Sequence, residues 1–199
     1  MRNATVADLP GLKNRELLRR LLNGCEGTLP ADLPQLGCSA DEIEQRYGLS
    51  PAAAERLGLA LELGRRSMLQ RPLPQKPFEG GADVFEYLAP RLQFSRVEEF
   101  WALYLDAKGR LLHKSRISQG TLTSSLVHPR EVFAPALIHR AASVLVAHNH
   151  PSGDPEPSND DRATTKRLCK SGNLLGIEVL DHIIIGAGHY YSFLENGII

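Results

Sequence analysis

The segment RPLPQKPFEGG, residues 71–81, carries three prolines and two glycines in eleven positions and interrupts any helical pattern. Such a stretch is typical of a linker between domains. The residue patterns before and after it also differ, because only the part that follows contains strand-like segments. We therefore expect a domain over residues 1–70, a linker over 71–81 and a second domain over 82–199.

Three segments before the linker have helical patterns. They are NRELLRRLLNG (14–24), SADEIEQRYG (39–48) and SPAAAERLGLALELGRRSML (50–69). The third begins with Ser50 and Pro51, a suitable pair for an N-cap and a first helical turn. These segments predict a small all-α domain.

Strand-like and helix-like segments alternate after the linker. The helical patterns are DVFEYLAPRL (83–92), expected to end near Pro90, HPREVFAPALIHRAA (128–142) and NDDRATTKRLCKSGNLLG (159–176). The strand-like patterns are the hairpin EEFWALYLDAKGRLLHKSRISQG (98–120), SVLVAHNH (143–150), EVLDHIIIG (178–186) and HYYSFLENG (189–197). This order predicts an α/β domain with a mixed sheet.

The overall composition is that of an ordinary soluble protein. Lys and Arg total 23, as do Asp and Glu, so bulk charge gives no indication of a nucleic-acid or membrane partner. The N-terminus lacks the apolar core of a signal peptide and no run of eighteen apolar residues occurs, so we expect a cytoplasmic protein. Cys25, Cys38 and Cys169 are widely spaced, which disfavours a disulfide framework or a CxxC metal site.

In VLVAHNHPSGDPEPSNDD, residues 144–161, an apolar strand ends in two histidines. Residues two apart in a strand point the same way, so His148 and His150 face one side at the strand's C-terminal end. Neutral imidazoles that converge can bind a metal, but a catalytic zinc site needs a third protein ligand and an open position for water. The local candidates for that ligand are Asp154, Asp160 and Asp161.

The same stretch also has an ordinary structural interpretation. Ser158 and Asp161 form SxxD ahead of a helix, which is a capping pattern with acids favourably placed against the helix dipole. Taken alone, SxxD is more often a cap than a site, and an isolated HxH pair carries little weight. Their combination at this spacing is far more specific.

The combined pattern, HxHPxxxxxxSxxD, resembles the JAMM signature of the MPN/JAB metallopeptidases. It is formed here by His148, His150, Pro151, Ser158 and Asp161. The surrounding sequence, with LVHPREVFAPAL upstream and LDHIIIG downstream, is similar to the bacterial RadC family over roughly residues 78–199. The resemblance implies a cytidine-deaminase-like, JAB/MPN α/β fold, a mixed sheet with flanking helices, preceded by a small all-α domain.

The resemblance also implies roles for particular residues. His148, His150 and Asp161 would hold a Zn²⁺ ion, with a water in the remaining position. Zinc-bound water ionises near neutral pH, which supplies a hydroxide. Ser158 would donate a hydrogen bond to the oxyanion that forms when an amide carbonyl is attacked, and it can also cap its helix.

JAMM enzymes further use a glutamate from an early strand to take the water's proton and pass it to the leaving amine. This chain offers Glu98 and Glu99, and two neighbours on a strand cannot both face the zinc. The ExF spacing usual in RadC-like chains selects Glu98, whereas counting back along the strand as in the wider JAMM class selects Glu99. We take Glu98 as the expected base.

Several other polar residues have weaker signals. Asp181 and His182 in LDHIII also occur in the family pattern, but on an apolar strand we expect them to be structural. The segment GTLTSS, residues 120–125, is similar to the family's stretch beside the cleft and would contact substrate. The histidines without ligand spacing, expected to lie outside the site, are His128, His139 and His189.

The stretch YGLSPAAAERL, residues 47–57, resembles the second half of a helix-hairpin-helix, a motif that binds the DNA backbone. Ser50 replaces the second glycine of the usual turn, so the turn is degraded. The basic residues that could contact phosphates, or simply form a solvated helix face, are Arg46, Arg56, Arg65 and Arg66.

We therefore expect a zinc-dependent metallopeptidase that cleaves a peptide or isopeptide bond in a peptide or protein substrate. One alternative is a non-catalytic metal- or protein-binding module that the helical domain docks to DNA or to a repair or replication complex; another is a metal-dependent nuclease. The ligand triad and the available glutamate favour catalysis, because a structural zinc is usually closed by four protein ligands. The balanced charge and the degraded turn count against a nuclease.

Overall fold

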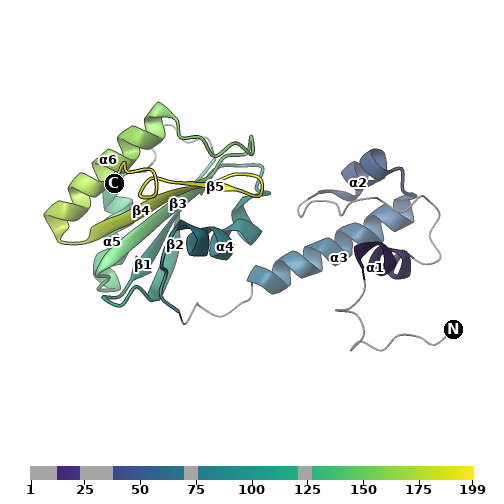
Figure 1. Ribbon diagram of the computed structural model, residues 1–199, viewed down its shortest axis with the longest axis horizontal. Helices are drawn as coiled ribbons and strands as arrows, with labels where there is room; N and C mark the ends of the chain where they lie inside the picture. Colours follow the sequence, from purple (N-terminus) through teal and green to yellow (C-terminus); the bar gives the residue numbers. More distant parts are fainter. Residues whose placement is uncertain (1–12, 23–37, 70–75, 121–126) are drawn as a thin grey trace. The chain divides into compact units, whose positions relative to one another are not determined.

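The computed structural model describes residues 13–22, 38–69, 76–120 and 127–199 (Figure 1). The chain divides into two compact units, Met1–Gln70 and Arg71–Ile199. The expected linker falls at this division, although its last residue, Gly81, is already the first residue of a helix.

The described part of the first unit is helical. Its elements are α1 (Asn14–Leu21), α2 (Ala40–Tyr47) and α3 (Pro51–Leu69). A capping box begins α2, because Ser39 and Glu42 each accept a hydrogen bond from the other's amide, and Gly48 ends it in the left-handed conformation with φ 63°. The apolar residues that form the core of this unit are Leu18, Leu22, Ile43, Leu49, Ala53, Ala54 and Leu57. The helices of these described residues agree with the expected small all-α domain.

The second unit contains a five-stranded mixed sheet in the order β2-β1-β3-β4-β5. The strands are β1 (Glu99–Leu105), β2 (Leu111–Gln119), β3 (Ser143–Asn149), β4 (Glu178–Ile185) and β5 (Tyr190–Ser192). The central strand β3 runs antiparallel to β1 and parallel to β4, while the pairs β1/β2 and β4/β5 are antiparallel. The predicted α/β class with a mixed sheet is confirmed.

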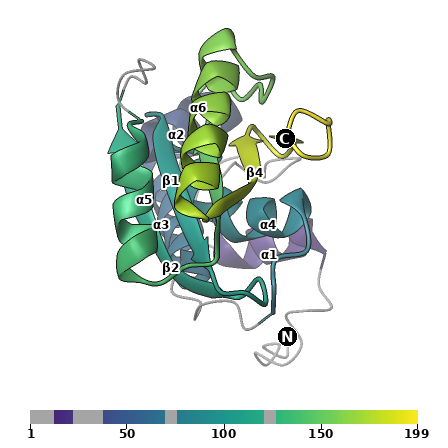
Figure 2. The ribbon, with the colours of Figure 1, turned by 90° about the vertical axis from the view of Figure 1, so that its left-hand side faces the viewer.

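Helices cover both faces of this sheet. One face packs on α4 (Gly81–Leu92) through residues such as Trp101 and Leu103, and the other packs on α5 (Pro129–Ile138) and α6 (Asn159–Leu175) (Figure 2). Phe100, Ala102 and Tyr104 face the α5/α6 layer because side chains alternate along a strand. Every residue of β1 and β3 is buried, which explains why residues 100–105 and 144–147 are continuous apolar runs.

Three element boundaries differ from the sequence predictions. α4 continues through Pro90 to Leu92. Pro90 costs the helix one hydrogen bond to the preceding turn, but burial of Leu92 against the sheet holds the last turn in place. α5 ends at Ile138 instead of continuing to Ala142, and Arg140 takes a positive φ of 52° at its end. The final predicted strand is short, since β5 spans three residues before the chain turns.

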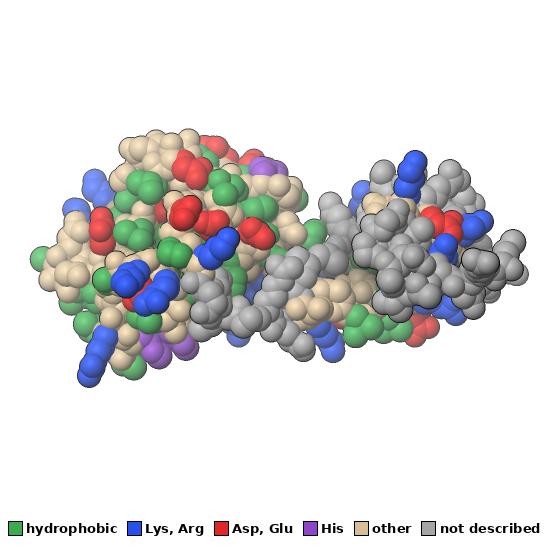
Figure 3. Space-filling model, turned by 60° about the horizontal axis from the view of Figure 1, so that its bottom comes forward, with side chains coloured by type: hydrophobic (Ala, Val, Ile, Leu, Met, Phe, Trp, Pro, Cys, Tyr) green, Lys and Arg blue, Asp and Glu red, His purple; other side chains and the backbone are tan. Residues whose placement is uncertain are grey.

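The surface of the described residues has two features that bear on partners. None of the helices in these ranges has both the length and the apolar character needed to cross a membrane. On the face of the molecule in Figure 3, Lys and Arg side chains lie among Asp and Glu side chains, so both signs of charge are interspersed there.

Candidate metal centre

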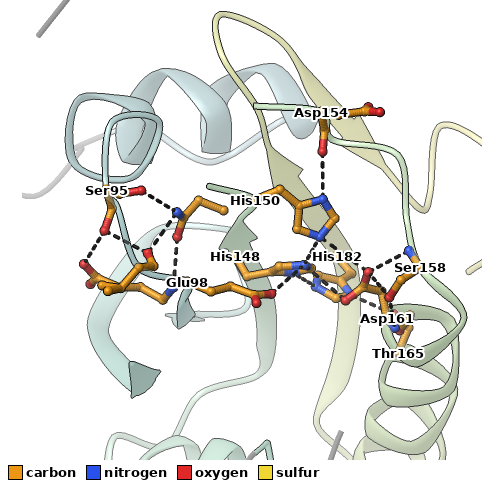
Figure 4. A network of polar contacts seen from close by, with 12 residues as sticks. Ser95, Glu98, His148, His150, Asp154, Ser158, Asp161, Thr165 and His182 are labelled. Carbon is orange, nitrogen blue, oxygen red and sulfur yellow. Dashed lines mark hydrogen bonds and ion pairs between the residues drawn. The ribbon is translucent and has the colours of Figure 1, made fainter. Parts of the chain in front are cut away.

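The central strand brings both histidines of the HxH pair to one point. His148 lies in β3 and its side chain is fully buried, whereas His150 follows Asn149, the last residue of the strand. The Nε2 atoms of the two rings lie 3.1 Å apart (Figure 4). Two ring nitrogens that meet at one point are the arrangement that chelation of a single metal ion requires.

The loop after His150 turns back onto the end of β4. The amide of His150 donates to Ile185 O at 3.1 Å, and the amide of Ala187 donates to Gly153 O at 2.9 Å. Gly186 has no room for a side chain, because a Cβ there would collide with the carbonyl oxygen of Gly153. This close packing fixes the path of the loop between the strand end and α6.

Asp161 reaches the histidines from the first turn of α6. Ser158 is the N-cap: its Oγ accepts a hydrogen bond from the Asp161 amide at 3.2 Å, and its own amide donates to Asp161 Oδ2 at 2.7 Å. Asp161 Oδ1 lies 3.1 Å from His148 Nε2, and Oδ2 lies 3.5 Å from His150 Nε2. The capping box therefore holds the carboxylate against both rings.

Asp154 contributes through its backbone. Its carbonyl oxygen lies 2.7 Å from His150 Nδ1, so Nδ1 carries a hydrogen, and in the neutral ring Nε2 then has a lone pair on the side that faces Asp161. The Asp154 carboxylate instead accepts a hydrogen bond from the Glu156 amide at 3.0 Å. Of the three aspartates that the sequence offers as a third ligand, Asp161 is the one beside the two rings.

Glu98 completes the cluster from the residue just before β1. Its Oε1 lies 3.7 Å from His148 Nε2. Glu98, His148, His150 and Asp161 each offer one ligand atom, and these atoms all lie within 4.8 Å of one another. Within the described ranges, no other group of three or more His, Cys, Asp or Glu residues lies so close. The four residues can therefore bind a metal ion.

Glu99 points to the other face of β1. Its carboxylate accepts hydrogen bonds from Trp101 Nε1 at 3.1 Å and from Ser95 Oγ at 3.3 Å. Arg91 Nε and an Arg116 guanidinium nitrogen lie 4.0 Å and 3.6 Å from Glu99 Oε2. Of the two adjacent acids, Glu98 is thus the one at the cluster, and Glu99 is a buried acid with its own partners.

Asn149, between the two histidines, holds the chain on either side of Glu98. Its Oδ1 accepts a hydrogen bond from the Glu99 amide at 2.9 Å, and its Nδ2 donates to Val97 O at 3.1 Å and to Ser95 O at 3.4 Å. Its residue type alone does not mark it as part of the site. Strand alternation is the signal that points to it, because the residue between two histidines that share a face must point to the opposite face.

Burial and neighbouring charges shift the pKa values of the cluster residues in different directions. Burial lowers the pKa of His148, and the neighbouring carboxylate of Asp161 only partly offsets that effect. The neighbouring carboxylate of Asp161 raises the pKa of the less buried His150. Burial acts to raise the pKa of Asp161, yet the two imidazoles hold that pKa well below its usual range. The carboxylate is therefore ionised, as a metal ligand must be.

Comparison with known proteins agrees with this geometry. Residues 78–198 match the family described as the RadC-like JAB domain. The chain belongs to this family. A UPF0758 protein of Trichlorobacter lovleyi is 45% identical over 184 residues, covering 92% of this chain and 79% of that protein. A UPF0758 protein of Symbiobacterium thermophilum is 43% identical over 188 residues, covering 92% and 80%, and one of Methanococcoides burtonii is 44% identical over 169 residues, covering 84% and 74%.

In this RadC-like JAB domain the hydroxyl of Ser158 is already engaged. Besides capping α6, Ser158 Oγ donates to Asp161 Oδ2 at 2.6 Å. A hydroxyl has a single hydrogen to donate, so a donor role toward a substrate oxygen requires this O–H to turn away from Asp161. The capping interpretation of SxxD is therefore confirmed, and a second role needs a rotation of the hydroxyl.

His182, which the sequence led us to expect as a structural residue, lies against the cluster. Its Nε2 lies 2.9 Å from His148 Nδ1, and burial holds its pKa well below the usual value. Parallel pairing sets Val146 opposite His182, so both side chains share the face that carries His148. Asp181 faces the other way, where its carboxylate accepts hydrogen bonds from Ser192 Oγ at 2.6 Å and from the Leu194 amide at 2.9 Å.

The remaining candidate residues lie away from the cluster or outside the described ranges. His128 caps α5 by accepting from the Arg130 amide, and His139 stacks on His113 with ring centroids 4.0 Å apart. Cys38 and Cys169 are free thiols. The candidates that fall outside the described residues are Cys25, Thr121, Thr123, Ser124 and Ser125.

Proposed function

We propose that this chain is a zinc-dependent metallopeptidase that hydrolyses a peptide or isopeptide bond of a protein substrate. One observation carries the proposal: two histidines, an aspartate and a glutamate from three separate parts of the chain converge within 4.8 Å. Membership of the RadC-like JAB domain family supports it.

The chemistry of these side chains suits zinc. Two imidazole nitrogens combined with carboxylate oxygens favour a borderline ion such as Zn²⁺ over Mg²⁺ or Ca²⁺, which prefer oxygen ligands alone. His148, His150 and Asp161 would hold the ion, because their donor atoms are the closest to one another. Zinc bound by three protein ligands supplies a coordinated water with a pKa of about 7.

Glu98 would act as the general base. Its Oε1 is farther from His148 Nε2 than is Asp161 Oδ1, at 3.7 Å against 3.1 Å, so a proton acceptor can sit beside the ligand set without belonging to it. Glu98 would take a proton from the attacking water and deliver it to the leaving nitrogen. Ser158, once its hydroxyl turns from Asp161, would stabilise the negative charge that develops on the carbonyl oxygen.

Exposure of the side chains indicates the side from which a substrate would enter. His148 is completely buried, whereas the side chains of Glu98 and His150 are 21% and 18% exposed. The buried ring forms the floor of the site and the partly exposed groups form its edge. A substrate carbonyl can therefore approach between Glu98 and His150.

Metal analysis combined with a substrate survey tests the proposal. The wild-type chain, His150→Ala and Glu98→Gln would each be incubated with zinc, dialysed and analysed for bound metal, then assayed with a peptide library and with isopeptide-linked peptides. We expect one zinc ion in the wild type and in Glu98→Gln, none in His150→Ala, and cleavage by the wild type alone.

Other outcomes would favour different functions. Zinc binding without cleavage of any peptide would indicate a binding module, and zinc-dependent cleavage of plasmid DNA included in the survey would indicate a nuclease. Three of the four arginines that could contact phosphates already have partners within their own unit, which gives the nuclease little support. Arg65 and Arg66 bind Glu62, and Arg56 donates to the carbonyl of Leu21. A wild-type chain that binds no metal would overturn the proposed function.

A further inference from the structure

A chain of hydrogen bonds leads away from the cluster behind His148 (Figure 4). His148 Nδ1 lies 2.9 Å from His182 Nε2, and His182 Nδ1 lies 2.6 Å from Thr165 Oγ1. Thr165 Oγ1 then donates to the backbone carbonyl of Asp161 at 2.7 Å. The chain thus begins at one residue of the cluster and ends on the backbone of another, through side chains that are almost entirely buried.

The carbonyl at the end of this chain determines the direction of every bond in it. A carbonyl oxygen can only accept, so the single hydroxyl hydrogen of Thr165 points to Asp161 O. Thr165 Oγ1 must then accept from His182 Nδ1, which places a hydrogen on that nitrogen. His182 lies between the rings of Phe100 and Phe193, with centroids 5.4 Å and 4.9 Å away, and this apolar setting favours the neutral imidazole.

The direction of these bonds fixes the tautomer of His148. A neutral His182 with its hydrogen on Nδ1 presents a lone pair at Nε2, so it accepts a hydrogen bond from His148 Nδ1. His148 Nε2 then carries no hydrogen. This is the nitrogen that lies 3.1 Å from both His150 Nε2 and Asp161 Oδ1, at the point where a metal would be bound.

We propose that Thr165 and His182 are positioning residues that hold His148 in the Nδ1–H tautomer and so increase the affinity of the cluster for its metal. This inference rests on the proposed zinc site. A metal-bound histidine is commonly held in this way by a partner on its other ring nitrogen, and loss of such a partner typically weakens metal binding about 10- to 100-fold. Here the partner is a second histidine, which a threonine holds in turn.

Two substitutions of Thr165 separate this role from simple packing. Thr165→Val keeps the shape of the side chain and removes the hydroxyl, whereas Thr165→Ser keeps the hydroxyl and removes a methyl group. The dissociation constant for zinc would be measured on the full chain by competition with a chelator at fixed pH. We expect Thr165→Val to bind zinc about 10- to 100-fold more weakly and Thr165→Ser to stay within about three-fold of the wild type.

A spectroscopic measurement on the metal-free protein reports the tautomer directly. In ¹⁵N-histidine spectra, His148 of the wild type and of Thr165→Ser should be protonated at Nδ1, and His148 of Thr165→Val should show both tautomers. If Thr165→Val does not fold, His182→Phe and His182→Gln take its place. Phenylalanine fits between the flanking rings but cannot accept a hydrogen bond, whereas glutamine offers an oxygen to His148, so only the phenylalanine variant should lose affinity.

The outcomes separate this inference from the proposed function. Equal zinc affinity and an unchanged His148 tautomer in Thr165→Val, or equal affinity in the two His182 variants, would overturn the inference and leave the zinc site standing. The expected loss of affinity in a chain that cleaves no peptide would support the inference and count against the peptidase. A wild type that binds no zinc would overturn both.

Discussion

The side-chain oxygen of Asn149 accepts a hydrogen bond from the amide of Glu99 at 2.9 Å, and this bond ties the strand of the two histidines to the start of β1. Asn149 also donates hydrogen bonds to the carbonyls of Val97 and Ser95, so it holds the backbone on both sides of Glu98. These bonds therefore help to hold the backbone of the proposed base beside the proposed metal ligands.

Replacing Asn149 should lower the stability of the protein without preventing metal binding. Asn149→Ala removes three hydrogen bonds to buried or partly buried backbone groups, so we expect the free energy of unfolding to fall by about 2–3 kcal/mol in urea denaturation of the metal-free protein. Zinc stoichiometry should stay at one, because His148 and His150 point away from the face that carries Asn149. Hydrolysis should fall about 100-fold, since Glu98 is no longer held in place.

The exposed Asn173 of α6 provides a matched control. Asn173→Ala should change the free energy of unfolding by less than about 0.5 kcal/mol, as is usual for surface substitutions. Equal effects of the two substitutions would mean that the Asn149 bonds contribute nothing specific.

The neighbouring acids should have opposite phenotypes. Glu98→Gln should keep zinc and lose about 10²- to 10⁴-fold in hydrolysis, because an amide cannot take up the proton. Glu99→Gln should destabilise the chain by about 1–3 kcal/mol, because it weakens charge-assisted bonds to Trp101 and Ser95, and should leave hydrolysis within a few-fold. Steady-state rates and urea denaturation of both variants check this, and a large loss of rate in Glu99→Gln would refute the assignment of the base.

Ser158 should show two separable roles. Ser158→Ala removes the cap of α6 and should cost about 1 kcal/mol of stability. It also removes the proposed donor to the oxyanion, which should lower the rate constant for hydrolysis by about 10²- to 10³-fold. Ser158→Thr retains a hydroxyl and should recover most of the stability and most of the rate of hydrolysis. If the loss of stability alone accounts for the lower rate of Ser158→Ala, then Ser158 acts only as a helix cap.

Zinc should stabilise the second unit against heat. Free zinc at about 100 times its dissociation constant adds about 2.7 kcal/mol, which corresponds to a rise in Tm of about 5–10 °C for a domain of this size. His150→Ala should lose this rise, and Mg²⁺ at the same concentration should produce little of it. Differential scanning calorimetry with EDTA-treated protein is the measurement. An equal rise in the Tm of His150→Ala would mean that zinc binds at a different site.

Much of the fold could be predicted from local patterns, because helix caps and strand alternation are short-range signals. The capping boxes at Ser39 and Ser158 and the left-handed Gly48 and Gly176 mark helix ends that the sequence already indicates. The end of α4 could not be predicted in this way. Burial of Leu92 against the sheet extends that helix past Pro90, and tertiary packing of this kind is absent from a local pattern.

Strand pairing explains why Glu98 lies at the cluster and Glu99 does not. β1 and β3 are antiparallel with Phe100 opposite His148, so the two side chains share a face, and Glu98, two residues before Phe100, shares it too. The role of His182 depended on the parallel register between β3 and β4. Neither register can be deduced from one strand alone, because pairing is set by residues far apart in the chain.

The alternation in HNH also limits how β3 can vary in length. Inserting or deleting one residue between Val144 and His148 would turn both imidazoles under α4 and aim Asn149 at the cluster, because a shift of one position exchanges the two faces of a strand. A change of two residues would restore the faces but move the rings about 7 Å along the strand, away from Asp161. Any chain that keeps this site by the same geometry must therefore keep this strand at the same length.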